Sequence, residues 1–173
     1  MPYSPTIQTL NLRAIADNLL GYFASTQSDA LTWSGTALSV TGLTTVAKFS
    51  ASAASRELPV FPAMMFVDDN DAVEHGEDML TGVYTCTLEL MIQNADPDTV
   101  VSKAKAYAKA FVSMIANCPK STLEANTGCV AGTSQLILME TSFEPIKTNE
   151  LHNDFLQVVQ IKPTFSVVAG AYV

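Results

Sequence analysis

The residues from Leu80 to Asn117 constrain the fold most, because they form a long strand pattern, a short turn and a long helix pattern. Along the first half, even positions are apolar or small and odd positions are mostly polar. The even set is Leu80, Gly82, Tyr84, Cys86, Leu88, Leu90 and Ile92. Successive side chains of a strand point to opposite faces of its sheet. The alternation therefore predicts one long strand with a single buried face.

A helix is expected directly after this strand, because Asp96 and Pro97 form a helix start. An aspartate can cap free N–H groups, and a proline at the first helical position has no donor to leave unpaired. Apolar residues then recur at spacings of three and four, which is typical of an amphipathic helix. They are Val101, Ala104, Ala108, Phe111 and Ile115, with Lys103, Lys105 and Lys109 largely off the stripe. Asn117 to Pro119 should end this helix.

The N-terminal part predicts a first amphipathic helix that opens at Ser4 or Thr6 and frays beyond Ala24. Residues 25–57 are rich in Ser, Thr, Ala and Gly, and we expect a flexible loop there. Short strand candidates inside it are Ala30–Trp33 and Leu38–Val40, the second extending through Thr44–Phe49, with turns at Gly35 and Gly42. The Ser50–Ser55 stretch is either a loop that orders against a neighbour or an ordinary surface loop.

Three further strands are expected. Leu58–Val67 is apolar, but Pro59 and Pro62 cannot donate ladder hydrogen bonds, so its pairing should begin after them or lie at an edge. Gln135–Phe143 should place Leu136 and Leu138 on one face and Ile137 and Met139 on the other. After a polar turn at Lys147–Asn153, Asp154–Val168 forms the last strand, interrupted by Pro163. Residues 169–173 form an apolar tail that could pack on a partner.

The order of these elements is helix, strands, helix and strands, with no internal repeat. Two amphipathic helices can cover one face of a mainly antiparallel β-sheet. The expected fold is therefore a single α+β domain over residues 1–173, with both helices packed on one face of the sheet.

Residues 68–78 form an acidic segment with six carboxylates and no Lys or Arg: Asp68, Asp69, Asp71, Glu74, Glu77 and Asp78. A calcium-binding EF-hand needs oxygen ligands at fixed loop positions, a glycine at position 6 and a glutamate at position 12. Counted from Asp68, these two positions hold Val73 and Met79, so the match fails. The segment is therefore predicted to be a solvated acidic loop between two strands, with no metal. If the protein forms a ring, we expect this loop to line the lumen or to face a basic partner.

The chain carries a formal net charge of −8, which argues against a nucleic-acid-binding surface, since such a surface needs a basic patch. Only 15% of residues are charged; either the fold simply has few charges or partners cover much of its surface. No apolar run is long enough to span a membrane, and the N-terminus lacks the pattern of a signal peptide. The three cysteines match no metal-binding spacing, so we expect reduced thiols in a cytosolic setting.

No catalytic motif is visible. The two histidines, His75 and His152, have no local partner at a catalytic or zinc-binding spacing. The sequence also lacks a phosphate-binding loop and a G-x-S-x-G nucleophile motif. We therefore expect no enzyme, no catalytic residue and no cofactor.

The order and style of these elements resemble the tail terminator proteins of long-tailed bacteriophages, also called tail completion proteins. The resemblance rests on the N-terminal helix, the proline-bearing strand Leu58–Met64, and the alternating strand Val83–Ile92 with the helix Asp98–Ile115 after it. It also includes a strand ending in Phe143–Ile146 and the closing strand Phe155–Ile161. No diagnostic motif is involved, and residues 25–55 have no counterpart in it.

This resemblance implies a structural virion protein that is assembled in the host cytoplasm and located at the tail or neck. It would form a homo-hexameric ring that caps the tail tube, stops tube polymerisation and joins the tail to the neck protein of the head. DNA would cross its lumen without specific binding. The alternatives are another tail or neck component, such as a tube or connector protein, and a cytosolic ligand-binding α+β domain.

Overall fold

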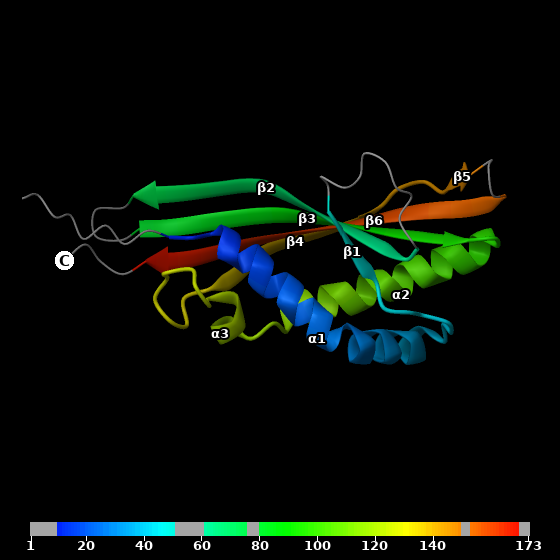
Figure 1. Cartoon of the computed structure of the whole chain (residues 1–173), viewed down its shortest axis with the longest axis horizontal. Coiled ribbons are helices and arrows are strands. Elements are labelled where there is room, and N and C mark those ends of the chain that lie inside the picture. The colour runs from blue at the N-terminus through cyan, green and yellow to red at the C-terminus, as the bar shows by residue number, and fades with distance from the viewer. Residues whose placement is uncertain (1–9, 51–60, 76–79, 150–152, 170–173) are drawn as a thin grey trace, which may run out of the picture.

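The computed structural model describes residues 10–50, 61–75, 80–149 and 153–169. Its elements, in chain order, are α1 (Arg13–Leu38), β1 (Ala47–Ser50), β2 (Ala63–His75), β3 (Leu80–Asn94), α2 (Pro97–Ala116), α3 (Lys120–Leu123), β4 (Gln135–Phe143), β5 (Lys147–Asn149) and β6 (Asp154–Ala169). Figure 1 shows α1 and α2 on the same side of a long twisted sheet. The predicted α+β fold with a mainly antiparallel sheet is confirmed.

The six-stranded sheet has the order β1-β2-β3-β6-β4, and β5 also pairs with β6. All its pairs are antiparallel except β1 with β2, which run parallel through four residue pairs from Ala47 with Ala63. The two longest strands, β3 and β6, form the centre of the sheet. Among the described residues, β4 and β5 form one edge and β1 with the outer part of β2 forms the other.

Strand β3 has the alternation that the sequence predicts. Its even positions from Leu80 to Ile92 are buried and its odd positions are half-buried. The buried side faces the helices, where Leu88 and Leu90 are at most 1% exposed. Both neighbours, β2 and β6, pair with this strand over most of its length, so its apolar positions set which face of the sheet is the core.

Helix α2 begins where the sequence predicts. The Asp96 carboxylate accepts a hydrogen bond from the Thr99 backbone N–H at 2.7 Å, and Pro97 occupies the first turn. The buried face is wider than the predicted stripe, because Val100, Tyr107 and Met114 are also buried, whereas Val101 is only half-buried. The Tyr107 hydroxyl donates to the Thr44 carbonyl at 2.9 Å, which ties α2 to the segment before β1.

The core lies between the two helices and the covered face of the sheet. Phe23 of α1 meets Phe111 of α2 edge-to-face, with ring centroids 5.1 Å apart. Both rings are at most 2% exposed. This aromatic pair joins the two helices over the sheet residues beneath them, and it belongs to one continuous apolar cluster with β3 and β6.

The expected loop at residues 25–57 is wrong in its first part, because α1 continues to Leu38 and includes the Ala30–Trp33 strand candidate. Its Ser and Thr hydroxyls bond to carbonyls one turn earlier, as in Thr26 to Tyr22 at 2.7 Å and Thr36 to Thr32 at 2.9 Å. Such back-bonding lets these residues occupy a helix. Burial of Leu31 supplies the packing that local propensity lacked.

The remainder of that segment matches the sequence only in places. Gly35 lies inside α1 rather than in a turn, and the helix ends instead at Ser39, which has a φ of 55°. Gly42 does take a turn conformation, with a φ of 68°. Residues 47–50 form β1, which overlaps the predicted Thr44–Phe49 extension and ends one residue beyond it, whereas Leu38–Val40 is not a strand. The proposed helix openings at Ser4 and Thr6 and the rest of Ser50–Ser55 lie outside the described residues.

The last three strands differ from expectation in detail. A bulge between Leu136 and Leu138 breaks the alternation of β4, so Leu136 and Met139 pack against the core while Ile137 and Leu138 are both exposed. The predicted polar turn at Lys147–Asn153 begins with the short strand β5. Strand β6 continues through Pro163, although its register with β3 has no pair between Thr164 and Ile161.

Pairing of β2 begins at Ala63, after Pro62, as expected.

We expect Phe111→Ala to lower the free energy of unfolding by about 3–5 kcal/mol, because it removes a fully buried ring and leaves a cavity. Urea denaturation followed by circular dichroism measures the change. Phe143→Ala is the matched control, since Phe143 is 45% exposed and should cost far less. Equal losses in the two variants would contradict the assigned core.

The Asp96 cap predicts a pH dependence of stability. Hydrogen bonds from the Thr99 side chain and backbone lower the pKa of this carboxyl below its usual 3.8. A lowered folded-state pKa stabilises the protein fully above the unfolded-state pKa, and this stabilisation is lost as the pH falls through the folded value. Urea midpoints measured from pH 6 to 2 should therefore fall less steeply for Asp96→Asn, which keeps the cap without titrating. An unchanged slope would be evidence against the cap.

Candidate interaction surface

The acidic segment is not a loop, and this prediction is wrong for residues 68–75. Asp68, Asp69, Asp71 and Glu74 belong to β2, which pairs with β3 from Ala63 to His75. Glu77 and Asp78 lie outside the described residues. Backbone ladder bonds do not depend on side-chain charge, so the long apolar alternation of β3 can hold an acidic partner strand. The carboxylates are consequently carried on a sheet and not on a free loop.

One of these carboxylates, that of Asp69, lies on the face of the sheet that carries none of the described helices. The register shifts between Asp68 and Asn70. The Asp69 carboxylate there accepts a hydrogen bond from the Thr87 hydroxyl and lies 3.4 Å from the Lys162 ammonium. The contact joins β2, β3 and β6 on one surface. Asp71 is exposed and forms no ion pair with a described residue.

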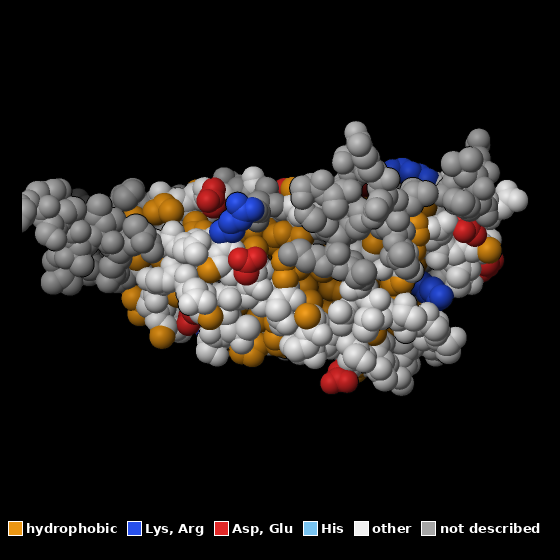
Figure 2. Space-filling model, viewed as in Figure 1, with side chains coloured by type: hydrophobic (Ala, Val, Ile, Leu, Met, Phe, Trp, Pro, Cys, Tyr) orange, Lys and Arg blue, Asp and Glu red, His pale blue; other side chains and the backbone are white. Residues whose placement is uncertain are grey.

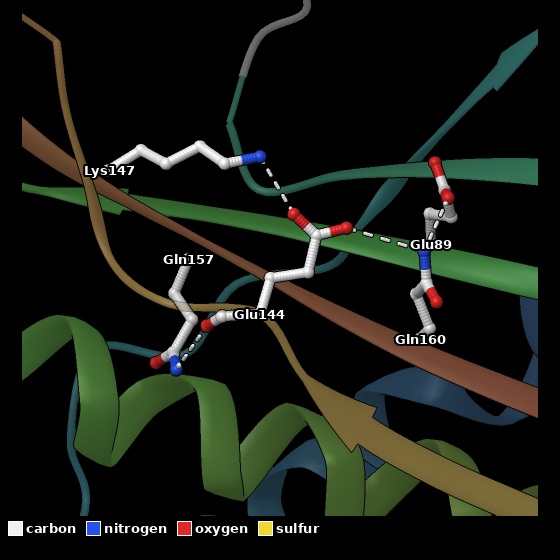
Figure 3. Close-up of polar contacts among 5 residues, drawn as sticks. All are labelled: Glu89, Glu144, Lys147, Gln157 and Gln160. Atoms are coloured by element: carbon white, nitrogen blue, oxygen red, sulfur yellow. Dashed lines mark hydrogen bonds and ion pairs between the residues drawn. The ribbon is translucent and has the colours of Figure 1, made fainter.

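A row of polar side chains crosses β3 and β6 on the same uncovered face. Thr85 and Thr164 lie opposite each other with their hydroxyls 3.1 Å apart. The Gln160 amide donates to Glu89 at 2.9 Å and to the Glu144 carboxylate at 3.3 Å, and Lys147 pairs with Glu144 at 2.8 Å (Figure 3). These polar side chains satisfy each other's hydrogen-bonding groups, so they form a fixed polar surface. This arrangement is less typical of a catalytic group.

A polar groove opens on this face beside β4. It has a volume of about 480 Å³ and is lined by Thr87, Glu140, Thr141, Ser142, Gln160 and Lys162. Small-molecule pockets are mostly apolar with a few polar groups, and this lining has the opposite character. The groove can offer hydrogen-bond donors and acceptors to a partner surface, and we assign no ligand to it.

The edge next to this groove is apolar. Along β4 and just after it, Ile137, Leu138, Phe143 and Ile146 are 38–53% exposed. Strand β4 forms the edge of the sheet on this side, and among the described residues β5 pairs with the same neighbour, β6, farther along that edge. Exposed edge strands can pair with other chains, and soluble proteins usually protect such edges with charges, prolines or covering segments. On the face viewed in Figure 2, apolar side chains reach the surface between polar and charged ones.

The described residues contain no group of three or more His, Cys, Asp or Glu side chains that could hold a metal ion. None of the three cysteines forms a disulfide bond, and Cys86 and Cys118 are buried. Burial raises the pKa of Cys118 to about 11, so its thiol is protonated at neutral pH and is a poor nucleophile. None of the described helices is long and apolar enough to cross a membrane.

Comparison of the sequence with models of known protein families and with curated proteins gave no match. The polar row on β3 and β6 and the apolar edge of β4 are candidate surfaces that the sequence alone did not predict. A signal was present for the first, because Thr85, Thr87, Glu89 and Gln93 occupy the odd positions of the central strand. No comparable signal existed for the second, because strand order decides which strand lies at the edge.

We expect neutralisation within β2 to preserve the fold. Asp71→Asn removes an exposed charge from an acidic strand, so the thermal midpoint should stay constant or rise at low salt, where repulsion is least screened. Asp69→Asn is the contrast, because it loses the partner of Lys162; a partly exposed pair is worth at most about 1 kcal/mol. Unfolding of the Asp71→Asn variant would show that this carboxylate has a structural role instead.

Proposed function

We propose that this protein is the tail terminator of a long-tailed bacteriophage. Six copies form a ring that caps the tail tube, stops its polymerisation and joins it to the neck protein of the head. DNA crosses the lumen without sequence-specific binding. In the virion the protein lies between tail and head, and its role is structural, not enzymatic.

The observation that carries this proposal is the exposed apolar edge at β4. Ile137 and Leu138 are each more than half exposed, and the bulge turns both of them away from the core. A chain that works alone would gain nothing from two neighbouring apolar side chains on an open edge, and it would risk aggregation. A chain that works inside an assembly covers such an edge with a partner.

Three further features support an assembly role. One face of the sheet carries none of the described helices, and that face has a fixed polar row and an open groove. Strands β2 and β4 at opposite edges differ in character, acidic on one side and apolar on the other, as head-to-tail contacts in a ring require. The net charge of −8 favours passage of DNA over adhesion to it.

The native mass of the purified chain, measured alone and with tail tubes of the same phage, tests the proposal. We expect either a hexamer or a monomer that becomes a stoichiometric cap at tube ends, visible by light scattering and electron microscopy. Tubes assembled with the protein present should also stop growing. A monomer that ignores tube ends, or a protein that copolymerises along the tube, would contradict the terminator function.

The edge can be tested in the same assay with Leu138→Lys. A lysine on an exposed edge position should leave the fold intact and weaken ring formation or tube capping at least about tenfold. Gln135→Lys is the matched control: it adds the same charge to the same strand at an exposed position that is neither apolar nor part of the groove lining. Equal effects of both substitutions would point to net charge and not to the apolar edge.

A further inference from the structure

The helical layer carries an exposed aromatic side chain beside two lysines. Trp33, the sole tryptophan of the chain, lies on α1 and is 49% exposed. The Lys109 ammonium of α2 lies over its ring, 5.0 Å from the centroid. Lys105 lies one turn earlier on α2, is exposed to solvent and is on the same side of the helix as Lys109. We call Trp33, Lys105 and Lys109 the Trp33 patch.

Both lysines of the Trp33 patch lack an ion pair with any described residue. Tryptophan is among the residues most enriched at the energetic centres of protein interfaces. A cation held over its ring also creates a site that favours an approaching carboxylate, because the ammonium keeps unused donors. The patch is therefore suited to an acidic partner segment that also brings apolar contact.

The same chain offers such a segment on β2. This strand carries four carboxylates and no Lys or Arg. Within it, Asp71 and Val73 are two residues apart on one face of the strand; both are exposed, and Val73 is 41% exposed. Asp71 and Val73 pair with Tyr84 and Gly82 of β3, so they lie on the side of the sheet that faces the helices. Both remain exposed, because the helical layer does not cover this part of β2.

These two surfaces cannot meet within one molecule. Figure 1 shows the end of β2 at one end of the long axis, whereas the second half of α1 and the neighbouring part of α2 lie toward the other. A contact between them must join two copies head to tail. Contacts between different patches repeat from copy to copy, and they produce a closed ring when the rotation closes.

We propose that the Asp71–Val73 stretch of β2 in one copy docks on the Trp33 patch of the next copy and forms the repeating contact of the ring. Asp71 pairs with Lys105 and Lys109, and Val73 covers the indole of Trp33. That the copies form a ring rests on the proposed function. The two contact surfaces, in contrast, are assigned from their charge and exposure. The partner is a second copy because both complementary surfaces belong to this chain.

Charge reversal tests the contact. Lys105→Glu with Lys109→Glu, and separately Asp71→Lys, should each reduce the native mass toward the monomer and weaken self-association at least about tenfold. An equimolar mixture of the two variants should assemble again, because each reversed surface meets a reversed partner. Lys103→Glu is the matched control: it makes the same change on the same helix, but Lys103 lies beside the Gly42 turn and does not share the i, i+4 side of α2 with Lys105 and Lys109.

Trp33→Ala separates the aromatic contact from the charges, and it should weaken assembly without lowering the thermal midpoint appreciably, since half of the side chain is exposed. Wild-type assembly that persists in all these variants would overturn the inference and leave the terminator function standing. Variants that assemble normally but no longer cap tubes would also overturn it, since the patch would then bind the tube. Loss of assembly with recovery in the mixture, in a protein that ignores tubes, would support the contact and reject the terminator function.

Discussion

The structure depends on how β3 is buried. This strand pairs with β2 and β6 on its two edges, and its even-numbered side chains lie under α1 and α2. Because side chains alternate across a strand, burying that set fixes the opposite set on the uncovered face. The polar row, the Asp69 contact and the groove all lie on that second face. The surface available to partners is therefore a consequence of the way the core is packed.

A sheet covered on one face leaves its second face and its two edges available for contacts. Many polar groups of the second face bond to each other across strands, as Gln160 does with Glu89 and Thr85 with Thr164. The β4 edge has no such internal partners, because its exposed side chains are apolar and none of the described residues pairs beyond it. The physical case for assembly is strongest at this edge, and the Trp33 patch on the helical layer adds a surface of different chemistry.

Two bulges change which side chains of β2 and β4 lie on each face of the sheet. In β2 the bulge changes the face of the residues beyond it, so that Asp71 pairs with Tyr84 and lies on the side of the sheet that faces the helices. In β4 the bulge exposes Ile137 and Leu138 together, although simple alternation would hide one of them. One extra residue in a strand reverses the side-chain direction beyond it, so a bulge can change a surface without changing the order of strands. Alternation read along the sequence cannot detect this, because it assumes a regular partner strand.

The sequence by itself determined the elements whose patterns are strong and local: the strand at Leu80–Asn94, the capped helix after it and the mainly antiparallel α+β class. Tertiary structure decided the rest. Packing of Leu31 against the core and back-bonding of Thr26 extended α1 through a segment whose composition predicts a loop. Pairing with β3 made a strand of acidic residues 68–75, because ladder bonds between backbones outweigh the low strand propensity of Asp and Asn. Local patterns reveal how a segment can bury one face, but only the complete sheet decides which neighbours it meets and which edge remains open.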